Sequence, residues 1–210
     1  EVVAIIGDNR PRLYATFAAV QSIGGIAVPA YQDSVADEMA YVLDHAETKF
    51  AVVQNQEQVD KLISIADRLP KLRTIIYEEE RGLGSYDPAR LHSFEHVQTL
   101  GREEMRSNPG AAGWWLDEIA KGKGSDVSVM LYTSGTTGRP KGVMLTHDNI
   151  VLSAQNANTF DKFTSDDTML AYLPMAWVGD HIFSYGQSIA GAICVGCPEG
   201  PETIVEDRRE

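Results

Sequence analysis

The sequence predicts an α/β fold, with a parallel sheet that carries helices on both faces. Short apolar segments typical of buried strands begin at Val2, Ile26, Phe50 and Thr74, each 24 residues after the one before. A helix-like pattern separates them. Because strands that are apolar throughout are buried on both faces, this alternation predicts a βαβαβαβ arrangement over residues 1–77. The 210 residues, 43% of them hydrophobic, are enough to bury a core.

The first strand and the second helix have the clearest local signals. The strand ends at the polar residues 7–11, which lack the G-x-G-x-x-G pattern of a dinucleotide-binding turn. The helix follows the second strand, with Ser34 as its expected N-cap. Its apolar residues recur at nearly 3.6 spacing and predict a stripe that packs on the sheet. They are Val35, Met39, Val42, Leu43 and Ala46.

Residues 78–126 lack this regularity and are expected to form an irregular excursion that ends in a linker. The acidic run Glu78 to Glu80 is interpreted as a solvated turn rather than a metal site, because adjacent carboxylates on one turn do not converge. We expect Trp114 and Trp115 to anchor the excursion on the core.

The range 127–210 resumes with an apolar strand and then the run YTSGTTGRPKG at residues 132–142. Its hydroxyls, glycines and cations supply many short donors on a bendable backbone, which a multiply charged phosphate group needs. The run is not a Walker loop, since Pro140 disfavours a helix and Lys141 precedes glycine rather than Ser or Thr. By composition alone, a phosphate-binding loop and a mobile hairpin loop both fit. Either way, a second strand is expected at 143–145.

Regular elements are expected in the rest of the chain. A helix over 147–158 has Thr146 as its expected N-cap, and apolar segments predict a strand at 168–173, a helix at 181–190 and a strand at 192–197. His181 is interpreted as a cap or surface residue. Cys194 and Cys197 form a C-x-x-C pair, which is either a redox pair, half a zinc site, or two small apolar residues. The last is favoured because zinc needs four ligands and the sequence has no second pair.

The run at 132–142 resembles the phosphate-binding loop of the adenylate-forming enzymes, which include acyl-CoA synthetases, luciferases and peptide-synthetase adenylation domains. The segment Gly142 to His147 matches the family pattern Gly-Val-x-x-(Ser/Thr)-His, and Leu173 to Asp180 approximates a second family signature. The segment 31–34 is similar to long-chain fatty acyl-CoA synthetases. The resemblance spans essentially the whole chain and implies the N-terminal part of the large domain of such an enzyme.

The resemblance also implies the roles of individual residues. The loop would contact the β- and γ-phosphates of ATP, and Thr133 would share Mg²⁺ with a glutamate outside this sequence. The implied phosphate-binding residues are Thr133, Ser134, Gly135, Thr136, Thr137, Gly138 and Lys141. Arg139 is left out, because an arginine beside a proline can simply face solvent. Trp177, Gly179 and Asp180 would line the acyl pocket, although Trp177 and Asp180 stand where relatives carry His and Glu. Trp177 is therefore either a pocket wall or a core residue.

The implied activity is that of a long-chain fatty acid–CoA ligase, which activates a fatty acid with ATP to acyl-AMP and then forms the CoA thioester. ATP, Mg²⁺ and CoA are the implied cofactors, and the implied partners are small molecules. Catalytic groups are expected beyond residue 210, so the chain by itself is expected to be inactive. Two alternatives remain: an adenylation domain for an aryl or amino acid, and a catalytically inactive nucleotide-binding scaffold.

Charge and hydropathy narrow the class of protein further. The net charge of −12 argues against a nucleic-acid surface or an anionic membrane as a partner. No apolar run approaches the roughly 20 residues that span a bilayer, and no signal-peptide pattern opens the sequence. A cytoplasmic location is therefore expected. Both ends lie inside apparent elements, so we expect an excerpt of a longer enzyme.

Overall fold

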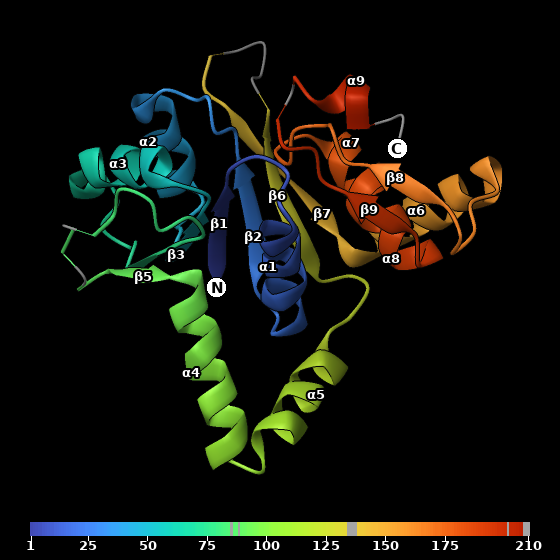
Figure 1. Cartoon of the computed structure of the whole chain (residues 1–210), viewed down its shortest axis with the longest axis horizontal. Coiled ribbons are helices and arrows are strands. Elements are labelled where there is room, and N and C mark those ends of the chain that lie inside the picture. The colour runs from blue at the N-terminus through green and yellow to red at the C-terminus, as the bar shows by residue number, and fades with distance from the viewer. Residues whose placement is uncertain (85, 88, 134–137, 201, 208–210) are drawn as a thin grey trace.

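The computed structural model describes residues 1–84, 86–87, 89–133, 138–200 and 202–207. One seven-stranded sheet has the order β5-β4-β3-β1-β2-β6-β7, and β8 and β9 form a separate parallel pair (Figure 1). In the large sheet every strand pairs in parallel except β7, which is antiparallel to β6. The strands are β1 (Val2–Ile6), β2 (Ile26–Ala30), β3 (Phe50–Val53), β4 (Thr74–Tyr77), β5 (Leu91–Ser93), β6 (Val127–Thr133), β7 (Lys141–Thr146), β8 (Thr168–Leu170) and β9 (Cys194–Gly196).

Helices connect most of these strands. They are α1 (Pro11–Ser22), α2 (Ala36–His45), α3 (Gln56–Ser64), α4 (Phe94–Ser107), α5 (Ala111–Lys121), α6 (His147–Asp161), α7 (Val178–Asp180), α8 (Gln187–Gly191) and α9 (Ile204–Asp207). A 3₁₀ turn covers Ala66–Arg68, and a π-helical segment, η2, covers His181–Gly186 between α7 and α8.

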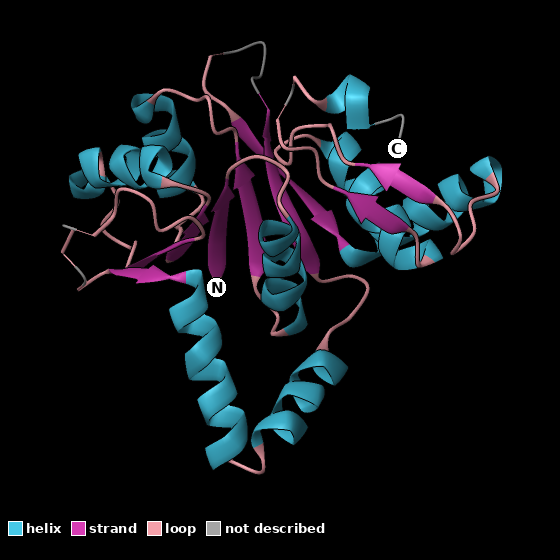
Figure 2. Cartoon of the chain, in the orientation of Figure 1, coloured by secondary structure: helices cyan, strands magenta, loops and turns pink. Residues whose placement is uncertain are grey.

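The sheet is buried on both faces, as predicted, and Figure 2 shows it as a central layer flanked by helices. Successive residues of a strand point to opposite faces. Ile5 of β1 therefore packs in a cluster with Phe17 of α1 and Ile150 of α6. Its neighbour Ile6 packs in the other cluster, which includes Leu43 of α2. β1, β2 and β3 each contribute buried residues to both clusters, which explains why these strands are apolar throughout.

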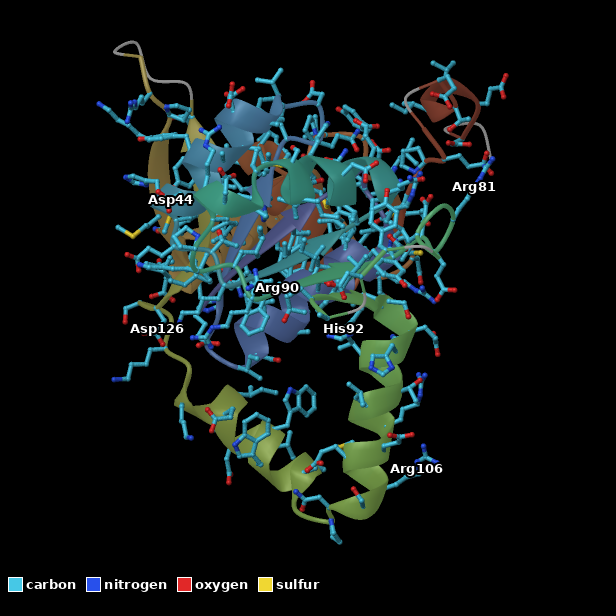
Figure 3. The ribbon with its side chains drawn as sticks, turned by 90° about the vertical axis from the view of Figure 1, so that its left-hand side faces the viewer. Asp44, Arg81, Arg90, His92, Arg106 and Asp126 are labelled. Atoms are coloured by element: carbon cyan, nitrogen blue, oxygen red, sulfur yellow. The ribbon has the colours of Figure 1, made fainter. Side chains whose placement is uncertain are left out.

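The expected irregular excursion at 78–126 is wrong in part, because it contains β5 and two helices. Figure 1 shows α4 and α5 extending from one edge of the sheet as a V. No described residue of α4 is buried, and Figure 3 shows Arg106 directed outward from this helix. Trp114 and Trp115 are 58% and 45% exposed, so they do not anchor α5 in the core. Neither helix buries a wide apolar stripe against the sheet, which is why the sequence pattern did not predict them.

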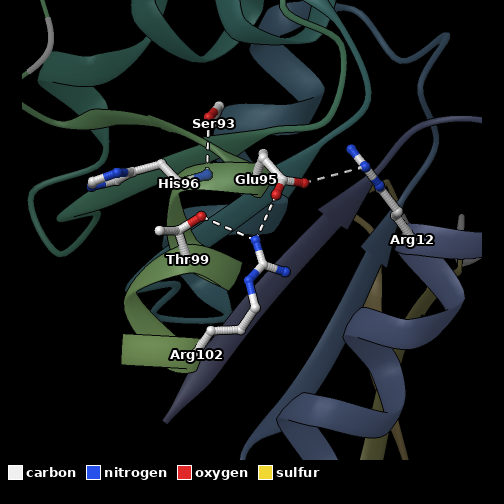
Figure 4. Close-up of polar contacts among 6 residues, drawn as sticks. All are labelled: Arg12, Ser93, Glu95, His96, Thr99 and Arg102. Atoms are coloured by element: carbon white, nitrogen blue, oxygen red, sulfur yellow. Dashed lines mark hydrogen bonds and ion pairs between the residues drawn. The ribbon is translucent and has the colours of Figure 1, made fainter. Parts of the chain in front are cut away.

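α4 contacts α1 through the ion pair of Glu95 with Arg12 (Figure 4) and through Phe94, which packs against a core cluster with the Arg12 guanidinium over its ring. Ser93 caps α4 by accepting a hydrogen bond from the His96 amide at 3.1 Å. The Glu95 carboxylate lies 3.7 Å from the Arg12 guanidinium of α1 and 2.5 Å from that of Arg102. Because these ion pairs are exposed, each contributes only about 0–1 kcal/mol to stability.

Other local expectations fare differently. The N-cap at Thr146 is confirmed, and Asn149 completes a capping box. The Thr146 hydroxyl accepts from the Asn149 amide at 3.2 Å, and the Asn149 side chain accepts from the Thr146 amide. Ser34 is not the N-cap of α2, because that position is taken by Val35, which offers no side-chain acceptor. The last two strands are shorter than expected. Cys194 is exposed in β9 rather than buried, and Cys197 is half-buried.

A buried polar cluster joins α1 to α7. Asp180 is fully buried, and its Oδ1 accepts hydrogen bonds from the Tyr14 hydroxyl at 2.6 Å and from Asn9 Nδ2 at 3.4 Å. Burial raises the pKa of Asp180 to about 6, against the opposing effect of the Tyr14 hydrogen bond. His181 is also buried rather than a cap or surface residue, and its Nε2 lies 2.8 Å from the Met175 carbonyl oxygen. Burial lowers the pKa of His181 to about 4.

The raised pKa of Asp180 predicts a pH-dependent stability that the change Asp180→Asn removes. A carboxyl with a folded pKa of about 6 and an ordinary value of 3.8 binds its proton more tightly in the folded state. Its contribution is therefore complete below about pH 3.8 and lost as pH rises through about 6. The variant should gain on the order of 3 kcal/mol over the wild type between those limits.

Chemical denaturation of the wild type and of Asp180→Asn across this pH range measures the difference in their free energies of unfolding. The opposing titration of His181 occurs in both proteins and cancels in this difference. Asp67→Asn, which changes an exposed aspartate, is the matched control and should give a flat difference. A flat difference for Asp180→Asn as well would contradict the raised pKa.

Candidate functional site

The glycine- and threonine-rich run lies between two strands, as predicted. β6 and β7 pair so that Lys141 stands opposite Thr133 and Gly142 opposite Tyr132. Thr133, Gly138 and Lys141 are exposed at the two ends of the loop. The predicted phosphate-binding residues Ser134, Gly135, Thr136 and Thr137 lie outside the described residues. The register thus brings one hydroxyl and one ammonium group together at the stem of the loop.

Two glycines have conformations or neighbours that a side chain would disturb. Gly138 has a φ of +107°, which favours glycine over residues with a Cβ atom. A Cβ at Gly142 would lie 3.0 Å from Met130 Sδ and 3.1 Å from the Cζ atom of Tyr132. The missing side chain therefore lets the Tyr132 ring lie against β7, where it joins the core beside α2.

The two cations of the run have different surroundings. Lys141 forms no ion pair with any carboxylate in the described part of the chain, so its ammonium group is available to an anion. Arg139 does not simply face solvent: its guanidinium carbon lies 5.3 Å from the centre of the Tyr41 ring on α2. One cation is thus presented to solvent and the other is held against a helix.

A cavity of about 520 Å³ adjoins the stem of the loop. β2 pairs with β6 at Ala27 and Val129, and Pro29 further along β2 has no amide hydrogen to donate. The cavity occupies the space between the carboxyl ends of these two strands. It is lined by Pro29, Ala30, Tyr31, Ser34, Glu38, Met39, Val42, Leu131, Tyr132, Thr133, Pro140, Val143, Leu145, Ala176, Trp177 and Val178. Its wall is mostly apolar, with Thr133 and Glu38 among the few polar groups.

Of the three predicted acyl-pocket residues, Trp177 alone lines this cavity. Its side chain is 50% exposed, which is incompatible with the alternative of a core residue. Gly179 is packed within 3.1 Å of Leu173, measured from the position of a Cβ atom, and Asp180 points to Tyr14 instead. Met39 and Val42 also line the cavity, which their sequence positions do not predict, because their helical spacing indicates only that α2 packs on the sheet.

No metal site is evident among the described residues, since no group of three or more His, Cys, Asp or Glu side chains converges. Glu78 of the acidic run is half-buried, and burial raises its pKa. Glu79 accepts a hydrogen bond from Gln54 Nε2 at 3.2 Å. The two cysteines are free thiols. Within the described ranges, no helix combines the length and the apolar character needed to cross a membrane.

Comparison with known proteins agrees with this geometry. The family model described as AMP-binding enzyme matches residues 1–208. The long-chain-fatty-acid–CoA ligase ACSBG2 of Xenopus laevis is 32% identical over 84% of the chain and 23% of its own length. The human protein of that name is 33% identical over 84% of the chain and 25% of its length. The chain therefore spans about a quarter of these relatives.

Solved structures share the fold at lower identity. ATP-bound MatB from Rhodopseudomonas palustris is 21% identical with a TM-score of 0.68, over 98% of this chain and 37% of its own. The anthranilate CoA ligase AuaEII in complex with anthranoyl-AMP is 19% identical with a TM-score of 0.71, over 99% of this chain and 37% of its own. With the family model matching nearly every residue, the chain belongs to the AMP-binding enzyme family.

Proposed function

We propose that the full-length protein carrying this chain is a long-chain fatty acid–CoA ligase, which uses ATP to form acyl-AMP and then transfers the acyl group to CoA. One observation carries the proposal: a mostly apolar cavity adjoins the stem of a loop whose sequence is rich in hydroxyl groups, glycines and cations. A fatty acid has an apolar chain and a carboxylate, so this juxtaposition suits its reaction with a nucleotide phosphate. The similarity to ACSBG2 supports the same class of substrate.

The stem residues fit a triphosphate in chemistry and charge. Lys141 and Thr133 are partners across the β6–β7 ladder, so their side chains leave the same face of the stem, and both residues are exposed. One ammonium about 4 Å from a phosphate contributes roughly 4 kcal/mol at an effective dielectric constant near 20. Carboxylates that lie more than about 10 Å from the loop are screened by salt. The local charge therefore outweighs the unfavourable net charge.

The Thr133 hydroxyl also fits Mg²⁺, which prefers oxygen ligands and keeps few protein contacts when it bridges phosphates. When bound, Mg²⁺ would neutralise charge on the departing pyrophosphate. The other protein ligands of the ion would come from outside this chain.

The chain's own part in the reaction is to bind and orient. The loop would hold the departing pyrophosphate while the cavity holds the apolar tail of the acid. The carboxylate would then attack the α-phosphate in line with the leaving group. In the second half-reaction the thiol of CoA displaces AMP, after pyrophosphate has left the loop. The first half-reaction therefore depends on this chain more than the second.

Exchange of radiolabelled pyrophosphate into ATP tests the proposal. The full-length protein should exchange with long-chain fatty acids in preference to aryl or amino acids. Preference for aryl or amino acids would identify an adenylation enzyme of another substrate class. Absence of exchange with every acid, by a folded protein, would indicate an inactive nucleotide-binding scaffold.

Lys141→Ala in the full-length protein should slow adenylate formation roughly 10-fold or more, because a charge-assisted contact contributes on the order of 1.5–3 kcal/mol. Thioester formation from preformed acyl-AMP should change less, since pyrophosphate is then absent. Rapid-quench measurement of each half-reaction separates the two. Lys123→Ala is the control, because it removes an exposed lysine that precedes β6 and lies outside the loop. Equal losses in both half-reactions would contradict the assignment of Lys141.

Trp177→Ala should shift substrate preference toward longer or bulkier acids, because removing the indole enlarges the cavity. A change of roughly 10- to 100-fold in relative kcat/KM is expected for a hydrophobic pocket. Rates over a series of chain lengths measure it. Trp114→Ala is the matched control. It also removes an indole that is about half exposed, 58% against 50% for Trp177, but this indole lies on α5 and does not line the cavity. Unchanged preference in Trp177→Ala, with uniformly lower activity, would remove Trp177 from the pocket.

A further inference from the structure

We infer that Tyr41 and His45 on α2 position the phosphate-binding loop by holding both of its ends, an inference that rests on the proposed function. His45 Nδ1 lies 2.7 Å from the Tyr132 hydroxyl. Tyr132 directly precedes Thr133, the last residue of β6. The two rings meet edge to face, 5.8 Å apart at 89°. The strand that enters the loop is therefore attached to the last turn of α2 by a hydrogen bond and an aromatic contact.

The other end of the loop is attached to the same helix one turn earlier. Arg139 follows Gly138 at the exit of the loop, and its guanidinium carbon lies 5.3 Å from the centre of the Tyr41 ring. Tyr41 and His45 are four residues apart, so they lie on one face of α2, with their rings 5.6 Å apart. One pair of neighbouring rings thus contacts both ends of the loop.

The surroundings of Arg139 favour a cation at this place. A second cavity of about 400 Å³ between α2 and the loop exit is lined by Asp37, Glu38, Asp44 and Arg68 together with Tyr41 and Arg139. Arg68 forms an ion pair with Asp37. Three carboxylates and two guanidinium groups therefore share this region, which holds Arg139 against the ring rather than repelling it.

The helix that bears the two rings is itself rigidly placed. Met39, Val42 and Leu43 of α2 are 1%, 7% and 0% exposed and pack in the core beside the sheet. Because Tyr132 and Arg139 are held against such a helix, the neighbouring residues Thr133 and Lys141 need less ordering when a ligand binds. The contacts would therefore increase affinity for phosphate groups without touching them. Tyr41 and His45 are positioning residues in this sense.

Titration of the full-length protein with Mg·ATP tests the inference, because binding is measured without catalysis. Tyr41→Leu removes the ring and His45→Leu removes the hydrogen-bond partner of Tyr132. Each should raise the Kd for ATP roughly 3- to 10-fold. Tyr41→Phe keeps the ring and should bind as the wild type does. In the ligase assay KM for ATP should rise, while KM for the acid and for CoA should not.

A double-mutant cycle separates positioning from general damage to the fold. Tyr132→Phe removes the hydrogen bond but keeps the ring contact with His45, so it should weaken ATP binding by no more than His45→Leu does. The double variant should bind ATP as His45→Leu does, with no further loss. Arg139→Met should likewise match Tyr41→Leu. These two variants test the contacts from the loop side should a substitution in α2 prevent folding, which thermal melting of each variant detects.

The possible outcomes distinguish this inference from the function on which it rests. A wild-type protein that does not bind ATP would overturn both. Normal binding by the wild type and equal binding by all variants would overturn the inference alone. Tighter binding by Tyr41→Leu would also overturn it, because Arg139 released from the ring would then be a direct phosphate ligand. Equal weakening by Tyr41→Phe and Tyr41→Leu would exclude the ring contact.

Discussion

The loop for which we propose phosphate binding depends on the antiparallel register of β6 and β7. In this register Gly142 faces Tyr132, and a Cβ atom in place of its hydrogen would lie 3.1 Å from the phenol ring. A shift by one residue would put Lys141 or Val143 opposite that ring, where a side chain has no room. The tight fit at Tyr132 therefore specifies the pairing of Lys141 with Thr133. The position of the stem pair is thus set by the packing of the adjacent pair, Tyr132 and Gly142.

The sheet in turn determines where that stem lies. The strands of the large sheet other than β7 run parallel, so their carboxyl ends lie at one end of the sheet. The loops that follow these strands therefore lie together at that end. β6 ends there and begins the loop, while β2 ends beside it and borders the cavity. α2, which follows β2, starts at the same end and faces the loop. A parallel sheet thus brings the segments around residues 30, 40, 133 and 177 together although they are distant in sequence.

The sequence predicts the parts of this structure that local patterns encode. The regular spacing of β1 to β4, the loop between two strands and the cap at Thr146 each rest on neighbouring residues, and each is confirmed. α4 was missed because only Phe94 of its apolar side chains packs against a core cluster, while Val97, Leu100 and Met105 are exposed. The burial of Asp180 depends on Tyr14, 166 residues earlier in the chain. The contact of His45 with Tyr132 joins residues 87 positions apart, so no local sequence pattern predicts it.

The same long-range contacts explain how Trp177 reaches the cavity. Asn9, just before α1, donates a hydrogen bond from Nδ2 to the Leu173 carbonyl oxygen at 2.9 Å, and Tyr14 of α1 donates to Asp180. The segment between Leu173 and Asp180 is therefore held at both ends by residues at the start of α1. Trp177 lies between these two attachments, with its indole against the cavity instead of the core. Asp180 thus affects the proposed acyl pocket through the backbone that carries Trp177. Residues of this segment can therefore be important for the pocket because they position Trp177, without lining the pocket themselves.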